Sequence, residues 1–114
     1  MKSALGAGGI IALQAESVFL HQAIVGGVMA SMARLFPVWD CAFTLVPTYT
    51  GGSIGVCLAP LGVELREPAC LPAPAVQQHL RYYTPAIHRA AFVLPAFAER
   101  IVAEMRSGGA SEVE

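Results

Sequence analysis

The stretch Val46-Pro47-Thr48-Tyr49-Thr50-Gly51-Gly52-Ser53-Ile54-Gly55 decides the fold, because it joins two apolar segments through a turn. Residues 38–46 before it and residues 54–59 after it are rich in the β-branched and aromatic side chains that favour strands. Two such segments joined by a glycine-containing loop predict an antiparallel hairpin. In this hairpin we expect three cross-strand pairs on one side of the sheet: Leu45 with Ile54, Phe43 with Val56, and Cys41 with Leu58.

The predicted hairpin places Tyr49 near its tip. Loops on a rigid scaffold often carry binding groups, and a tyrosine offers both an apolar ring and a polar hydroxyl. The alternative is an aromatic side chain that packs down onto the sheet. Spacing alone leaves both interpretations open.

A second candidate binding residue, Glu16, follows the continuous apolar segment 9–15. Such a segment is typical of a strand buried on both faces, with parallel neighbours. Ligands of open α/β sheets bind beyond the carboxyl ends of the strands, which is where Glu16 lies. The alternative is a carboxylate at a helix N-terminus, with Ser17 as a cap.

Helices are expected in the remainder of the chain. Residues 18–35 predict a helix that ends before Pro37 and is apolar all round, as buried helices are. Ser17 to Ala33 carry no formal charge, so a short membrane span is the alternative there. We further expect the end of a helix over residues 1–7, an irregular connection over 61–74, helices over 75–80, 86–92 (with Thr84 as its N-cap) and 96–106, and a disordered tail over 107–114.

Composition bounds the class of protein. The 114 residues suit one small domain, yet 55% are hydrophobic and only 13% are charged. So few charges indicate that part of the surface normally meets something other than water. The net charge of −1, with no cluster of lysine or arginine, argues against a nucleic-acid partner.

The cysteines and histidines suggest no metal chemistry. Cys41, Cys57 and Cys70 have no CxxC spacing, so we expect buried free thiols in a reducing, cytoplasmic compartment rather than a zinc site or a disulfide framework. The three histidines (His21, His79 and His88) lack a metal-binding spacing, and His88 is expected to be a hydrogen-bonded structural residue.

Four stretches occur together in a fixed order: residues 14–17 (QAES), 46–55 (VPTYTGGSIG), 66–68 (REP) and 80–98 (LRYYTPAIHRAAFVLPAFA). Together they resemble the C-terminal portion of the spermidine synthases, which are polyamine aminopropyltransferases. The resemblance runs from Met1 to about Arg106. It implies an α/β fold, namely the C-terminal part of a Rossmann-like methyltransferase-type sheet that ends in an antiparallel β-hairpin with flanking helices.

The resemblance implies three substrate-binding residues. Glu16 matches the glutamate of the family's Q-G-E-S/C segment at the polyamine site. Tyr49 matches the tyrosine of P-T-Y-P-S-G-Q-I-G-F, which lines the diamine pocket, and Ile54 falls on that motif's isoleucine. The chain departs from the family at Ala15 for Gly, Thr50 for Pro, Ser53 for Gln and Val56 for Phe, among other positions. The loss of proline loosens the loop, and serine lacks the reach of an amide, so both changes bear on the choice of amine.

The implied reaction is attack by an amine of putrescine, or a similar diamine, on decarboxylated S-adenosylmethionine, a co-substrate; no cofactor or metal is implied. The family's glycine-rich nucleotide segment and its D-x-x-D-P loop have no counterpart here, and Asp40 is the only aspartate. We therefore expect a fragment with no catalytic residue of its own, inactive alone and able to form a homo-oligomer or to join a full-length relative. The alternatives are a non-catalytic module that binds a full-length synthase and a small membrane protein.

Overall fold

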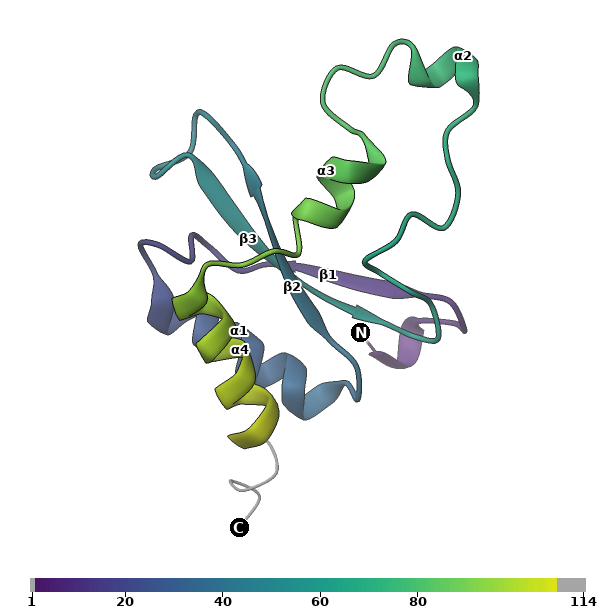
Figure 1. Cartoon of the computed structure of the whole chain (residues 1–114). Helices are drawn as coiled ribbons and strands as arrows, with labels where there is room; N and C mark the ends of the chain where they lie inside the picture. The colour runs from purple at the N-terminus through teal and green to yellow at the C-terminus, as the bar shows by residue number, and fades with distance from the viewer. Residues whose placement is uncertain (1, 109–114) are drawn as a thin grey trace.

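A computed structural model describes residues 2–108 and shows a three-stranded sheet with two long helices on one side (Figure 1). The strands are β1 (Ile10–Gln14), β2 (Asp40–Leu45) and β3 (Ser53–Pro60), in the order β1-β3-β2, and both pairings are antiparallel. The helices α1 (Gln22–Leu35) and α4 (Ala96–Gly108) pack against each other. A 3-10 turn, η1 (Lys2–Ala4), precedes β1, and the short helices α2 (Pro74–Gln77) and α3 (Pro85–Ala90) lie apart from α1 and α4. The α/β class and the hairpin are confirmed.

The hairpin register differs by one residue from the predicted one. Leu45 lies opposite Ser53, Phe43 opposite Gly55, and Cys41 opposite Cys57. Because side chains alternate along a strand, the expected partners Ile54, Val56 and Leu58 belong to the other face of β3.

Small side chains explain the observed register. Gly55, Cys57 and Ala59 form the buried face of β3, on which α1 packs. A Cβ atom on Gly55 would lie 2.9 Å from the backbone oxygen of Glu16, so a valine does not fit there. Close packing therefore selected the small residues, whereas the apolar pattern favoured the large ones.

The prediction for the first strand was wrong in two respects. β1 is not buried on both faces, because Ile10, Ala12 and Gln14 are exposed while Ile11 is buried. Its neighbour is also antiparallel, since β1 pairs with β3. Within residues 2–108, β1 is an edge strand of the sheet.

The first long helix is shorter and less buried than expected. α1 begins at Gln22 rather than at residue 18, because the carbonyl of Ser17 accepts hydrogen bonds from the backbone N–H groups of Leu20 and His21 in a turn. It buries one face only, and Ile24 and Leu35 are 53% and 54% exposed. α1 has 14 residues, and nowhere in residues 2–108 does a helix have the length and apolarity needed to span a membrane.

The later helices follow the sequence signals closely. The Thr84 hydroxyl accepts a hydrogen bond from the backbone N–H of Ile87 (3.0 Å), which confirms it as the N-cap of α3. α2 and α3 each begin one residue earlier than expected and end sooner. α4 begins at Ala96 as predicted and includes Ser107 and Gly108, which were expected in the tail. Residues 109–114 of that tail, and Met1, lie outside the described residues.

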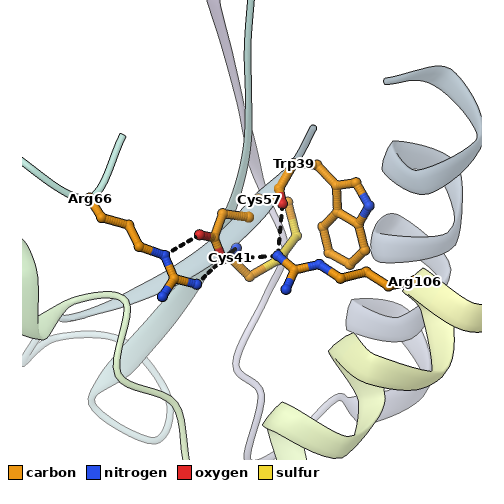
Figure 2. Close-up of a disulfide and its surroundings, with 6 residues drawn as sticks. Trp39, Cys41, Cys57, Arg66 and Arg106 are labelled. Atoms are coloured by element: carbon orange, nitrogen blue, oxygen red, sulfur yellow. Dashed lines mark hydrogen bonds and ion pairs between the residues drawn. A yellow bond between two sulfur atoms is a disulfide. The ribbon is translucent and has the colours of Figure 1, made fainter. Parts of the chain in front are cut away.

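The expectation of free thiols was wrong for two of the three cysteines. Cys41 and Cys57 are joined by a disulfide between the paired strands (Figure 2), and both are almost fully buried. Cys70 is the free cysteine among the described residues, and it is exposed. The one-residue change of register is what brings Cys41 and Cys57 opposite each other.

An ionic cluster anchors two surface segments to the start of β2. The buried carboxylate of Asp40 accepts hydrogen bonds from the Arg66 guanidinium at 2.6 and 3.1 Å, and Arg106 of α4 lies 3.5 Å away. Arg106 also donates to the carbonyl of Trp39 and lies over its indole ring (Figure 2). Asp40 therefore holds the loop after β3 and helix α4 against the sheet.

Candidate functional site

The hairpin loop holds Tyr49 through three short backbone hydrogen bonds. The Val46 N–H donates to the Gly52 carbonyl (2.8 Å), the Tyr49 N–H to the Val46 carbonyl (2.9 Å), and the Gly52 N–H to the Tyr49 carbonyl (2.8 Å). Gly51 and Gly52 have φ angles of 84° and 72°, which lie in the left-handed region that glycine adopts without strain. The two glycines thus close the loop on the side of Tyr49 that leads into β3.

The end of β1 is joined to β3 by a pair of backbone hydrogen bonds. The Ala15 N–H donates to the Gly55 carbonyl (2.8 Å), and the Gly55 N–H donates to the Glu16 carbonyl (2.7 Å). Glu16 has a φ of 62°, a left-handed conformation that is uncommon for a side chain of its size. The close approach of the two backbones fixes Glu16 beside the hairpin.

The structure brings the two main predicted residues into direct contact. The Tyr49 hydroxyl donates a hydrogen bond to the carboxylate of Glu16, and both side chains are half-buried. This contact gives Tyr49 a specific polar partner, which a ring that only packs on the sheet would lack. Glu16 is not at a helix N-terminus, because α1 begins at Gln22, and the Ser17 hydroxyl caps nothing since it has no hydrogen-bond partner.

The contact with Glu16 raises the pKa of the Tyr49 phenol. The hydrogen bond to Glu16, together with partial burial and the negative charge of the carboxylate, raises the pKa of Tyr49 above its ordinary value of 10.0. The Gln14 side chain acts in the opposite direction and lowers that pKa. Around neutral pH, Tyr49 is therefore a hydrogen-bond donor that orients the carboxylate.

Ile54 lies on the same side of the sheet as Gln14. The register pairs Gln14 with Val56, and Ile54 is two residues from Val56 on β3, so the two belong to one face. The paired register of β1 ends at Gln14, and Ile54 directly precedes Gly55, whose N–H group binds the Glu16 carbonyl. The three predicted site residues thus come from the end of β1, the hairpin loop and the start of β3.

The sequence reasoning missed Gly55 and Gln14 as parts of this site. A glycine inside a strand often marks a close backbone approach, and that signal was available for Gly55. Gln14 belongs to the same quoted stretch as Glu16, but a polar residue at a strand end has no single structural meaning.

Among the described residues, Glu16 differs from Asp40 and Glu67 in having no cationic partner. Asp40 is paired with Arg66 and Arg106, and Glu67 is paired with Arg89 at 2.7 Å. Over residues 2–108, Glu16 pairs with no lysine, arginine or histidine. A half-buried carboxylate oriented by a phenol and free of protein cations is suited to hold an ammonium group.

His88 is structural, as predicted. Its Nε2–H donates to the Leu65 carbonyl (2.7 Å), and its Nδ1 therefore accepts from the Tyr83 hydroxyl (3.0 Å). The ring ties α3 to the loop after β3. The part of the chain that the structure describes contains no group of three or more side chains able to hold a metal ion.

Solved structures share this fold, which has the features of a partial methyltransferase-like α/β domain. A spermidine synthase from Thermotoga maritima matches with a TM-score of 0.72 and 22% identity, over 90% of this chain and 36% of that chain. A spermidine synthase in complex with the transition-state analogue AdoDATO matches with a TM-score of 0.71 and 20% identity, again over 90% and 36%.

The sequence comparisons define the family. The model of the spermine/spermidine synthase domain matches residues 1–62, and the chain belongs to that family. It is 40% identical over 100 residues to a spermidine synthase of Dictyostelium discoideum, covering 88% of this chain and 35% of the relative. It is 40% identical over 103 residues to a polyamine aminopropyltransferase of Leptospira biflexa, covering 90% and 36%. The chain thus spans about a third of the length of the curated relatives it matches.

The substitution Gly55→Ala tests the joint between Glu16 and β3. The added methyl group would meet the Glu16 backbone oxygen at 2.9 Å, so we expect a loss of about 1–3 kcal/mol in the free energy of unfolding, measured with urea. Gly27→Ala is the matched control, because its Cβ meets nothing within 4 Å and alanine favours a helix, which should stabilise α1 by up to about 1 kcal/mol. Equal effects of the two substitutions on the free energy of unfolding would contradict the close contact between Gly55 and the Glu16 backbone.

Proposed function

We propose that this chain supplies the amine-binding part of a spermidine synthase-like aminopropyltransferase, with putrescine as the acceptor and decarboxylated S-adenosylmethionine as the donor. The contact between Tyr49 and Glu16 is the observation that carries the proposal, because these two residues match the family's polyamine-site motifs and lie together. The relatives named as spermidine synthases and polyamine aminopropyltransferases support the same activity.

The proposed site has the chemistry that a diamine requires. Putrescine carries two ammonium groups in water, and the Glu16 carboxylate would hold one of them by a charge-assisted hydrogen bond. Tyr49 would fix the carboxylate and present its ring face to the cation, while Ile54 would contact the aliphatic carbons. With one end held in this way, the other amine is positioned to react after it loses a proton.

In the transfer step, the neutral amine attacks the aminopropyl methylene carbon that is bonded to the sulfonium. The C–N bond forms as the C–S bond breaks, its electron pair stays on sulfur, and methylthioadenosine leaves. The new secondary ammonium then gives up a proton to a base. Asp40 is not suited to that role, because both of its carboxylate oxygens are engaged by arginine side chains.

Amine binding tests the site itself. We expect Glu16→Gln to weaken putrescine binding to residues 1–114 by roughly tenfold or more, because one charge-assisted hydrogen bond is lost, as measured by calorimetry or NMR titration. Glu67→Gln is the matched control. This exposed carboxylate is paired with Arg89 of α3 and not with Tyr49, so its loss should leave the affinity for putrescine unchanged. If both variants bind like the parent chain, Glu16 does not hold the amine.

Turnover tests how much of the enzyme these residues provide. We expect residues 1–114 alone to form little or no spermidine from putrescine and decarboxylated S-adenosylmethionine, because the donor-binding groups and the catalytic base are proposed to belong to parts of the family outside this chain. Chromatography of the reaction products measures the outcome. Robust spermidine formation would show that these residues contain a complete active site.

A second candidate function is that of a non-catalytic module docking onto a full-length synthase. One observation favours it. An apolar groove of about 780 Å³ lies between β1 and α1, lined mainly by Ile11, Leu13, Met32, Leu35 and Phe36. It adjoins the unpaired edge of β1, and a second polypeptide could extend the sheet there.

Co-expression with a full-length family member distinguishes this second candidate. We expect a mixed complex that elutes as one species in size-exclusion chromatography, because the groove and the β1 edge would both be covered. Replacing the exposed Ile10 with lysine should weaken the complex, since a charged residue on an edge strand opposes pairing. Two separate species with the unmodified chain would rule out the module.

A further inference from the structure

The disulfide lies in the core and joins β2 to β3. Cys41 and Cys57 are opposite residues of β2 and β3, with their Cα atoms 4.3 Å apart. Their exposed fractions are 4% and 0%, and both belong to the core cluster that packs against Met29 of α1 and Val102 of α4. The bond therefore joins the two strands on the face that carries the buried small residues.

A short structural path leads from this disulfide to Glu16. Gly55 is two residues from Cys57 on the same face of β3, and its N–H group holds the Glu16 carbonyl. A void of only about 10 Å³ adjoins the disulfide, and its lining includes Cys41, Cys57, Gly55 and Ala15. Ala15 and Gly55, which join the end of β1 to β3, are thus among the residues that line the same void as the disulfide.

Breaking the bond would disturb these neighbours. Two unbonded sulfur atoms must separate to van der Waals distance, which is much longer than a covalent bond, and a void of about 10 Å³ gives them almost no space. The strands or the adjacent side chains therefore have to move. The small residues Ala15 and Gly55 line the same void, so they are among the neighbours that this movement would displace.

We propose that the Cys41–Cys57 pair is a redox-sensitive clamp on the Glu16–Tyr49 site, which holds the two side chains together when oxidised and lets them separate when reduced. The amine-binding consequence rests on the proposed function; the effect on the Glu16–Tyr49 contact does not. In the reduction, a dithiol breaks the S–S bond, transfers two electrons and two protons to the two cysteines, and is itself converted to a cyclic disulfide.

The test compares oxidised and dithiol-reduced residues 1–114, with the redox state counted by mass spectrometry and thiol titration. On reduction, we expect the pKa of Tyr49, followed by NMR of labelled tyrosine rings, to fall toward its ordinary value because contact with Glu16 is lost. We expect the Kd for putrescine to rise roughly fivefold and the Tm to fall by roughly 10 °C. Cys70→Ser removes the exposed thiol and keeps the pair, so it should respond to reduction like the parent chain.

The outcomes separate the clamp from the proposed function. A shift of the Tyr49 pKa without putrescine binding in either state would support the clamp and contradict the amine site. Equal putrescine affinity and an unchanged Tyr49 pKa in both states would overturn the clamp, even if the Tm fell, because the disulfide would then be only structural. Three free thiols after mild oxidation would also overturn it. Because reduction is applied to the folded parent chain, the test does not depend on whether the variant Cys41→Ser/Cys57→Ser folds.

Discussion

The exchange of two backbone hydrogen bonds between Gly55 and the end of β1 is the constraint on which the rest of this structure depends. The Ala15 N–H donates to the Gly55 carbonyl (2.8 Å), and the Gly55 N–H donates to the Glu16 carbonyl (2.7 Å). This arrangement requires a glycine at position 55, because a Cβ atom there would meet the Glu16 carbonyl oxygen. It fixes the register of β1 on β3. It also sets Glu16 in a left-handed conformation beside the hairpin loop, where Tyr49 reaches it. Fold and candidate site therefore share one local cause.

The same constraint explains which features could be predicted from the sequence. The hairpin, the N-cap of α3 and the start of α4 follow from local signals, namely turn glycines, a Thr-Pro pair and a proline before a helix. The register does not, because periodicity identifies two faces of β3 without saying which one faces the helices. The pattern favoured the larger side chains, but the tertiary contact with Glu16 admits only Gly55. The disulfide was missed for the same reason, since a one-residue change decides whether Cys41 meets Cys57.

Two carboxylates of this chain illustrate how environment assigns different roles to the same chemical group. Asp40 is buried, and two guanidinium groups neutralise it, so it connects β2 to α4 and to the loop after β3. Glu16 is half-buried and has a phenol as its partner instead of a cation, so its negative charge is oriented but not compensated within residues 2–108. The sequence suggested Glu16 through a family motif and through its position after a strand. Only the geometry shows that Tyr49 is the hydrogen-bond partner of this carboxylate.

The uncovered apolar groove and the candidate site both adjoin strand β1. The face of β3 that carries Gly55 and Cys57 is sealed by α1 and α4, and the groove between β1 and α1 remains open. A surface of this kind is costly to leave in water, and the chain has few charges with which to keep it soluble. The groove is lined in part by Ile11 and Leu13 of β1, the strand that ends two residues before Glu16. The apolar groove and the candidate carboxylate are therefore linked along one short strand.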